Sequence, residues 1–310
     1  MNGEVSRREG ERRAVAIGGG HGAARTLRAL LDVADDVTAV VTVADDGGSS
    51  GRLRRDLDVL PPGDLRMALT ALARDPEMAR LVDFRFPRGE LGGHSLGNLM
   101  LVALASLAEG DMAAALRRCA QLLDVPGRVL PCTATPLTLH GETADGPVTG
   151  QVAIASTPRL QRVWVEPKDP QPTDGVVTAI EAADLVVLGP GSLYTSLLPN
   201  LLVPAIADAL SRAGGPVVFV GNLREQPGET EGMGLVDHLE ALASHVNDLH
   251  LDVVVAHDGP PPSGQGAALG TDRRLLSGYA DEVVLADLLD GDDGHEPSKL
   301  AAILNRVLRG

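Results

Sequence analysis

The feature that most constrains this chain is a short apolar run followed at once by a glycine-rich loop. Residues 14–17 are apolar and lead into Gly18-Gly19-Gly20-His21-Gly22, after which residues 23–33 carry the pattern of a helix. Residues 37–43 then form a second run rich in β-branched residues. A strand, a helix and a second strand in this order are typical of a parallel sheet covered by helices. The sequence therefore predicts a Rossmann-like, doubly wound, mostly parallel α/β fold with helices on both faces.

The rest of the chain continues the same alternation with one interruption. Strands are expected at 185–188, 217–220, 253–255 and 283–285, and helices at 64–74, 96–108, 112–123, 203–212, 235–244 and 298–308. Between them, residues 128–165 carry short alternating runs separated by turn residues, which predicts a small β-rich insert. Residues 14–310 are thus predicted to be a single domain with this insert, preceded by a flexible arm at 1–13.

Charge and composition exclude several classes of protein. The 310 residues carry a formal net charge of −15, and only 2% of them are aromatic. A nucleic-acid surface needs Lys and Arg to displace counterions, and single-strand binding needs aromatic stacking platforms. We therefore expect no nucleic-acid partner. Any anionic ligand has to be bound by local donors, because the overall charge repels it.

Nothing in the sequence predicts export or insertion into a membrane. No run of about eighteen apolar residues occurs, and the first thirteen residues are polar and rich in Arg and Glu, unlike a signal peptide. The two cysteines, Cys119 and Cys132, lack the paired spacing of a zinc site and are expected to be reduced. We expect a cytoplasmic protein.

The glycine-rich loop has the properties of a phosphate site. Gly18, Gly20 and Ala23 satisfy the pattern G-x-G-x-x-G/A, in which glycines let the backbone approach a phosphate at a helix N-terminus. The alternative is a tight turn that binds nothing. We predict nucleotide binding by Gly18, Gly19, Gly20, His21 and Gly22.

The segment after the second strand combines two acids with glycines and an arginine. Its sequence is Asp45-Asp46-Gly47-Gly48-Ser49-Ser50-Gly51-Arg52. A carboxylate here can bind a ribose, while two adjacent carboxylates can hold Mg²⁺ between phosphates. A solvated loop is the alternative. The predicted nucleotide contacts are Asp45, Asp46, Gly48, Ser49, Ser50 and Arg52, with Asp45 and Asp46 as possible Mg²⁺ ligands.

Two further segments carry polar groups beside predicted helices. Asp64 either caps its own helix or binds the ligand, and Arg66 lies one turn further on. The stretch Gly93-His94-Ser95-Leu96-Gly97 matches the G-x-S-x-G nucleophile elbow of esterases, but no buried strand precedes it. Ser95 is therefore expected to cap a helix rather than act as a nucleophile. We predict ligand contacts from Asp64, Arg66, His94, Ser95 and Asn98.

A second glycine-rich segment follows the strand at 185–188. It reads Gly189-Pro190-Gly191-Ser192-Leu193-Tyr194-Thr195, and its alternative role is a structural turn. Loops that follow parallel strands emerge at one edge of the sheet, where ligands bind in such folds. A single crevice lined by the loops at Gly18, Asp45, Gly189 and Asn222 is therefore expected. The predicted contacts from this half are Gly189, Gly191, Ser192, Tyr194, Thr195, Asn200 and Asn222.

Taken together, these motifs resemble a known family. The runs at 41–54, 60–66, 93–98 and 189–196 are similar, in the same order, to those of the YvcK-type gluconeogenesis factors of the CofD-like superfamily, whose other branch is 2-phospho-L-lactate transferase. The resemblance covers about residues 14–255. It departs at His21, where the family usually has Thr, and at 256–279, which is rich in Pro and Gly.

The resemblance implies a regulatory role. It suggests a factor that binds a UDP-sugar such as UDP-N-acetylglucosamine, supports growth on gluconeogenic carbon sources and influences cell wall and cell shape, with no firmly attached reaction. A cell-wall synthesis protein as partner and a homo-oligomer are expected. The rival hypothesis is a Mg²⁺-dependent phosphoryl or nucleotidyl transferase, in which Arg52 and Arg66 would bind the transferring group. A third hypothesis, a dinucleotide-binding oxidoreductase, rests on the glycine loop alone.

Overall fold

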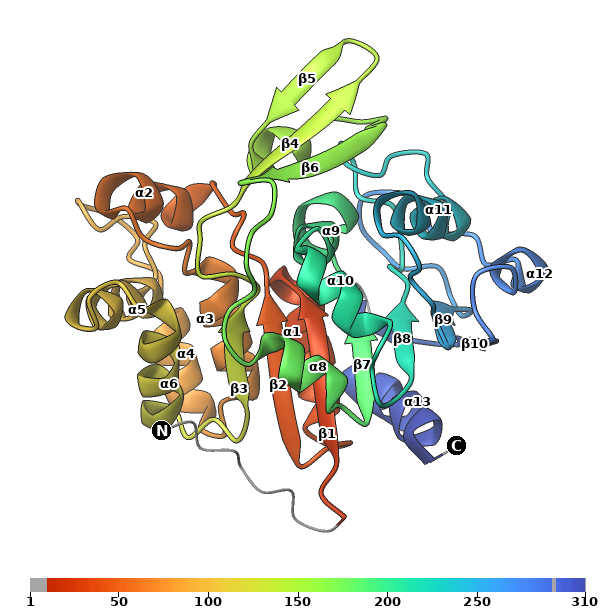
Figure 1. Ribbon diagram of the computed structural model, residues 1–310, viewed down its shortest axis with the longest axis horizontal. Helices are drawn as coiled ribbons and strands as arrows, with labels where there is room; N and C mark the ends of the chain where they lie inside the picture. The colour runs from red at the N-terminus through yellow and green to blue at the C-terminus, as the bar shows by residue number, and fades with distance from the viewer. Residues whose placement is uncertain (1–9, 292–293, 310) are drawn as a thin grey trace.

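The computed structural model describes residues 10–291 and 294–309. Its centre is a seven-stranded, fully parallel sheet in the order β10-β9-β8-β7-β1-β2-β3 (Figure 1). The strands are β1 (Arg13–Gly18), β2 (Asp36–Val41), β3 (Arg128–Pro131), β7 (Leu185–Leu188), β8 (Val217–Val220), β9 (Val253–His257) and β10 (Glu282–Ala286). The predicted doubly wound fold is confirmed.

Helices cover both faces of this sheet (Figure 1). The first half of the chain contributes α1 (Gly20–Leu30), α2 (Gly48–Leu57), α3 (Gly63–Leu72), α4 (Pro76–Asp83), α5 (Leu96–Leu107) and α6 (Met112–Leu122). The second half contributes α8 (Val176–Glu181), the π-helix η1 (Leu193–Leu197), α9 (Leu198–Leu201), α10 (Pro204–Leu210), α11 (Leu235–His245), α12 (Arg273–Leu276) and α13 (Pro297–Arg309).

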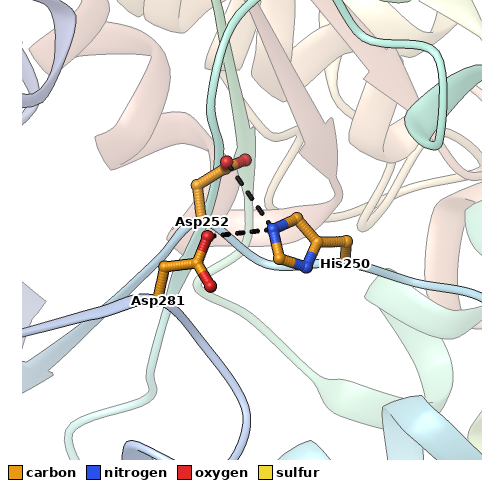
Figure 2. A group of neighbouring side chains, drawn as sticks. All are labelled: His250, Asp252 and Asp281. Carbon is orange, nitrogen blue, oxygen red and sulfur yellow. Dashed lines mark hydrogen bonds and ion pairs between the residues drawn. The ribbon is translucent and has the colours of Figure 1, made fainter.

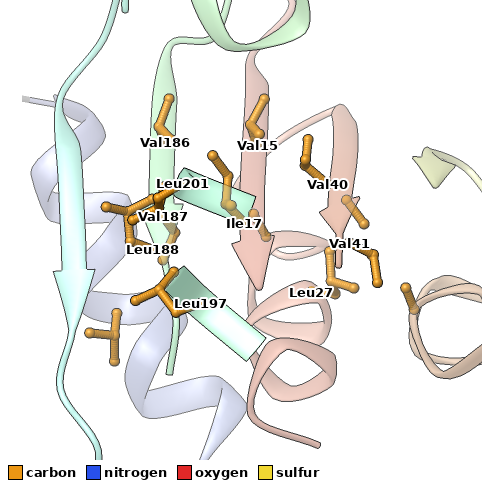
Figure 3. Close-up of a cluster of buried hydrophobic side chains, with 14 of the residues drawn as sticks. Val15, Ile17, Leu27, Val40, Val41, Val186, Val187, Leu188, Leu197 and Leu201 are labelled. Atoms are coloured by element: carbon orange, nitrogen blue, oxygen red, sulfur yellow. The ribbon is translucent and has the colours of Figure 1, made fainter. Parts of the chain in front are cut away.

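The central strands are apolar because both of their faces are covered. Ile17 of β1 lies between Val40 of β2 and Leu188 of β7, and all three side chains are buried (Figure 3). Leu27 of α1 packs in the same core (Figure 3). Burying an aliphatic side chain of this size contributes about 1.5–3 kcal/mol. This core fixes the position of the loop that leaves β1.

The β-rich insert begins later than the sequence predicted. Residues 128–131 form β3, which pairs in parallel with β2 at the edge of the main sheet. The separate antiparallel sheet consists of β4 (Thr138–Thr143), β5 (Gly146–Thr149) and β6 (Arg162–Glu166), with α7 (Gln151–Ile154) beside it. The start of the insert was predicted too early because β3 is short and lies at an edge of the main sheet, so its sequence reads like the short runs of the insert. In Figure 1 the insert stands over the carboxyl end of the main sheet.

At the two ends of the chain, the boundaries also differ from the expectation. Residues 1–9 of the predicted arm lie outside the described part, and Arg13 already belongs to β1. Near the C-terminus a two-stranded hairpin, β11 (Leu289–Asp290) and β12 (Gly294–His295), precedes α13.

Within the described residues, no single helix is long and apolar enough to cross a membrane, although the bent pair Leu193–Leu201 and Pro204–Leu210 reaches the required length and composition when its members are taken together.

Candidate nucleotide site

The site lies where the strand order reverses. From β1 the chain moves to β2 and β3 on one side, whereas β7, β8, β9 and β10 follow on the other. The loops after β1 and β7 consequently meet at this switch point, which is where ligands bind in open α/β sheets. A Cβ placed on Gly22 would overlap the carbonyl oxygen of Pro190. Glycine at 22 therefore permits the close contact between the two loops.

A pocket of about 180 Å³ opens between these loops. Asn222, at the end of β8, shapes one wall by pairing with the backbone of Gly191. Its Oδ1 accepts from the Gly191 N–H and its Nδ2 donates to the Gly191 carbonyl, both at 2.9 Å. The pocket is lined by both polar and apolar groups: His21, Gly22, Arg25, Pro190, Gly191, Asn222, Leu223, Arg224, Gln226, Gly294 and His295.

Two arginines line this pocket, although the whole chain is strongly acidic. Arg25 and Arg224 lie there beside the first turn of α1, and Arg25 also pairs with Asp290 at 2.6 Å. The pKa of His21 is lowered by burial first and then by Arg66 and Arg25. A helix N-terminus with guanidinium groups beside it favours an anion.

On the other side of the glycine loop lies a pair of acids. Burial, followed by the neighbouring Asp45 carboxylate, raises the pKa of Asp64 to about 7, while a hydrogen bond from the Gly20 N–H opposes the shift. A Cβ on Gly19 would overlap Asp64 Oδ2, so glycine is needed for this approach. Asp64 therefore binds the glycine loop, and within the described part of the chain no side-chain hydrogen bond caps the start of its own helix.

The second predicted Mg²⁺ ligand, Asp46, is engaged elsewhere. Its Oδ2 accepts from the Gln151 N–H at 3.1 Å and its Oδ1 from the Val152 N–H at 3.0 Å. These are the first N–H groups of α7, so Asp46 attaches the insert to the end of β2. The acid pair that the structure assembles is Asp45 with Asp64, and not Asp45 with Asp46.

The segment Gly48 to Arg52 is helical rather than a loop. It forms the first turns of α2, and Ser49 and Ser50 are buried there. Ser50 Oγ accepts from the Gly63 N–H at 3.0 Å, and Arg52 donates to the Gly92 carbonyl at 2.7 Å. These side chains join α2 to its neighbours.

A buried polar network connects α2, α3 and α5. Ser49 Oγ lies 2.9 Å from His94 Nδ1 and accepts from Asn98 Nδ2 at 3.0 Å. Arg66 Nε donates to Asn98 Oδ1 at 3.1 Å, and Arg66 also pairs with Asp83. Burial lowers the pKa of Arg66 to about 10. This network therefore engages side chains that were predicted from the sequence to contact the ligand.

Ser95 is a helix cap, as expected. Its Oγ accepts from the Asn98 N–H at 3.2 Å at the start of α5. Residues 84–94, all of them described, contain no strand, and only an isolated bridge joins Arg85 to Ser95. The nucleophile-elbow geometry, a strand followed by a helix, is thus not formed here.

In the second glycine-rich segment, a carboxylate of the protein itself accepts hydrogen bonds from the groups that were predicted to contact a ligand. Buried Glu229 accepts from the N–H groups of Tyr194 at 2.8 Å and Thr195 at 3.1 Å. Gln226 donates to Ser192 Oγ, and the buried Asn200 donates to the carbonyl of Gly18. Gly189 and Gly191 remain beside the pocket, whereas Tyr194 and Thr195 serve to hold η1.

Sequence reasoning missed several pocket residues. Arg25 lies one turn after His21 on the same helix face, so helical spacing would have indicated it. Arg224 follows Asn222 in a loop that the sequence did single out. His295 had no sequence signal, because the β11–β12 hairpin reaches the pocket only through the tertiary fold; its Nε2 lies 3.0 Å from the Gly221 carbonyl.

Comparisons with known proteins agree with this architecture. The family described as 2-phospho-L-lactate transferase CofD matches residues 14–273. A "Gluconeogenesis factor" of Halalkalibacterium halodurans is 44% identical, over 79% of this chain and 77% of the relative, and one of Bacillus subtilis is 42% identical, over 82% and 81%. A crystal structure of a UPF0052 family member from Bacillus halodurans is 37% identical and superposes with a TM-score of 0.89, covering 95% of this chain and 98% of that one. The chain therefore belongs to the CofD family, within its group of gluconeogenesis factors.

Proposed function

We propose that this protein is a regulatory factor that binds a nucleotide sugar, such as UDP-N-acetylglucosamine, in the pocket at the switch point. One observation carries the proposal: Arg25, Arg224 and the N-terminus of α1 converge on a single pocket in a chain of net charge −15. A nucleoside diphosphate group supplies the anion that such a site favours. His21 lies at the same helix start and adds a titratable donor.

The wider role proposed for the protein rests on its relatives. Their name supports a part in growth on gluconeogenic carbon sources. Control of cell wall and cell shape through a cell-wall synthesis protein, and assembly as a homo-oligomer, are further parts of the proposal. A regulator that reports the level of a cell-wall precursor would connect carbon supply with wall synthesis.

Titration calorimetry tests the binding proposal. UDP-N-acetylglucosamine and UDP should bind the protein, while uridine, which lacks the diphosphate, should bind at least about tenfold more weakly. The variant Arg25→Gln should lose a similar factor. Arg28→Gln is the matched control, because Arg28 lies one turn further along α1, is exposed and does not line the pocket. Absence of binding to the folded wild-type protein at millimolar ligand would refute the proposal.

A second candidate, the Mg²⁺-dependent transferase, is favoured by one observation. Asp45 and Asp64 repel each other beside the glycine loop strongly enough to help raise the pKa of Asp64. A cation between them would remove this repulsion and would lie next to the phosphates of a bound nucleotide. Asp46 does not fit such a site, since both of its oxygens are bonded to α7.

The two candidates differ in their dependence on metal. A transferase should turn over a nucleotide substrate only with Mg²⁺, and Asp45→Asn or Asp64→Asn should abolish the turnover. Asp56→Asn is the control, because Asp56 is an exposed acid of α2. Nucleotide-sugar binding without metal, and without product, would favour the regulatory factor.

A further inference from the structure

A group of three potential metal ligands lies at the opposite edge of the main sheet. Nε2 of His250 is 3.1 Å from Asp281 Oδ2 and 3.8 Å from Asp252 Oδ1 (Figure 2). The three ligand atoms all lie within 4.8 Å of one another. They come from the segment before β9 and from the residue before β10. The nucleotide pocket, by contrast, is at the carboxyl edge.

The two carboxylates of this group face each other because of the strand register. Asp252 and Asp281 directly precede Val253 and Glu282, which are partners in the parallel pair β9–β10. Side chains at equivalent positions of neighbouring strands point to the same side of a sheet. The register thus brings together two carboxylates, and a cation between them would offset their mutual repulsion.

The backbone fixes the direction of one of these carboxylates. Asp252 Oδ2 accepts a hydrogen bond of 2.7 Å from the Val217 N–H at the start of β8. This contact leaves Oδ1 turned toward His250. In metal sites, hydrogen bonds from residues outside the ligand shell orient the ligands in the same way. The Asp252 carbonyl also accepts from the Glu282 N–H at 2.9 Å, which fixes the two strands relative to each other.

We propose that His250, Asp252 and Asp281 form a binding site for a divalent transition metal of the Zn²⁺ type. Ligands about 2.0–2.2 Å from Zn²⁺ in a tetrahedron lie roughly 3.3–3.5 Å apart, and the two distances from His250 fall on either side of that range. An imidazole with two carboxylates favours Zn²⁺, Co²⁺ or Ni²⁺ over Mg²⁺ and Ca²⁺. The side chains are 63%, 39% and 71% exposed, so water completes the coordination and the metal can enter freely.

The bound metal would act as a cross-link. It would join the segment before β9 to the start of β10 and would replace the direct contacts of His250 with the two acids. β9 has five residues, which separates this site from the carboxyl edge by roughly 17 Å. The inference is therefore independent of the nucleotide proposal.

The experiment uses the full chain, freed of metal with a chelator and dialysed. Zn²⁺ titrated calorimetrically at pH 7.5 should show one site per chain that millimolar Mg²⁺ does not displace. His250→Ala and Asp281→Asn should each weaken Zn²⁺ binding by at least roughly tenfold to a hundredfold, which is the loss already seen when only an outer-shell partner is removed. His250 and Asp281 are both exposed, so these variants should fold.

Asp248→Asn is the matched control, because it removes a nearby acid at a left-handed position (φ 56°) that Asn also adopts. It should bind Zn²⁺ like the wild type. Co²⁺ gives a second readout, with visible absorption bands of a four-coordinate ion that disappear in His250→Ala. Equal Zn²⁺ affinity of the wild type and His250→Ala, or no binding by the wild type, would overturn the proposal.

Discussion

Ser49 and His94 are hydrogen-bonded to each other at 2.9 Å, although 45 residues separate them in the chain. Ser49 opens α2 and His94 precedes α5, so this bond holds two of the glycine-containing motifs against each other. Asn98 donates to the same Ser49 oxygen. The pair is buried, and burial is the main reason that the pKa of His94 is lowered. The hydrogen bond between the Ser49 hydroxyl and His94 Nδ1 is thus part of a buried structural network.

Replacing Ser49 by Ala should test this structural role. The variant leaves His94 and Asn98 with unsatisfied polar atoms in a buried place, which costs about 1–3 kcal/mol of unfolding free energy. Urea unfolding followed by circular dichroism measures the loss. Ser106→Ala on the exposed side of α5, where Ser106 bonds only to the Val102 carbonyl, should change stability by less than about 0.5 kcal/mol. A serine esterase activity that disappears in Ser49→Ala would contradict our assignment.

Gly22→Ala should separate the two loops of the pocket. Its Cβ would overlap the backbone carbonyl of Pro190, which cannot swing aside as a flexible side chain does. We expect a loss of about 1–3 kcal/mol in stability, as for other overpacked positions, together with weaker nucleotide-sugar binding. Thermal unfolding and calorimetry measure the two effects. Gly270→Ala, which has open space around its Cβ, is the control; equal behaviour of both variants would show that the loops are not in close contact.

Asp64 should make the protein less stable as the pH rises. Its pKa is about 7 in the folded state against 3.8 in its ordinary environment, so the unfolded chain releases this proton first. The stabilising contribution of Asp64 is complete below pH 3.8 and is lost as the pH rises to about 7. The loss amounts to roughly 2–4 kcal/mol. Asp64→Asn should remove this contribution in urea unfolding from pH 4 to 8, so that stability rises with pH relative to the wild type, whereas Asp56→Asn should keep the wild-type profile.

His295 should have the opposite effect over the same range. Burial lowers its folded-state pKa from 6.5 to about 4, so its stabilising contribution is present above pH 6.5 and is lost as the pH falls toward 4. His295→Gln should leave the Asp64 contribution uncompensated, so that stability falls more steeply between pH 4 and pH 7 than in the wild type. In the wild type, His295 and Asp64 partly cancel, and the double variant should therefore have a weaker pH dependence than either single variant. A His295→Gln profile identical to that of the wild type would contradict the lowered pKa.

By itself, the sequence determined the sheet and the edge at which the two glycine-rich loops meet. Apolar runs of four to six residues with glycines behind them predict buried parallel strands, and the carboxyl ends of such strands must meet at one edge. The glycine loop at 18–22 and the glycines at 189 and 191 were therefore placed correctly next to each other. The local pattern also predicted that Ser95 caps α5, because a helix cap forms between residues that are neighbours in the sequence.

Only the tertiary structure decided which polar side chains contact one another. Asp46 bonds to α7 more than 100 residues away, Glu229 fills the donors of Tyr194 and Thr195, and Asp45 faces Asp64 instead of its neighbour. The Glu229 contacts satisfy buried N–H groups, and in every one of these cases the partner depends on how distant elements pack. The same applies to Arg25 and His295, which become pocket residues because α1 and the β11–β12 hairpin meet at the switch point. Local patterns determine the strands and helices, whereas the pairing of polar side chains is fixed by contacts between segments far apart in the chain.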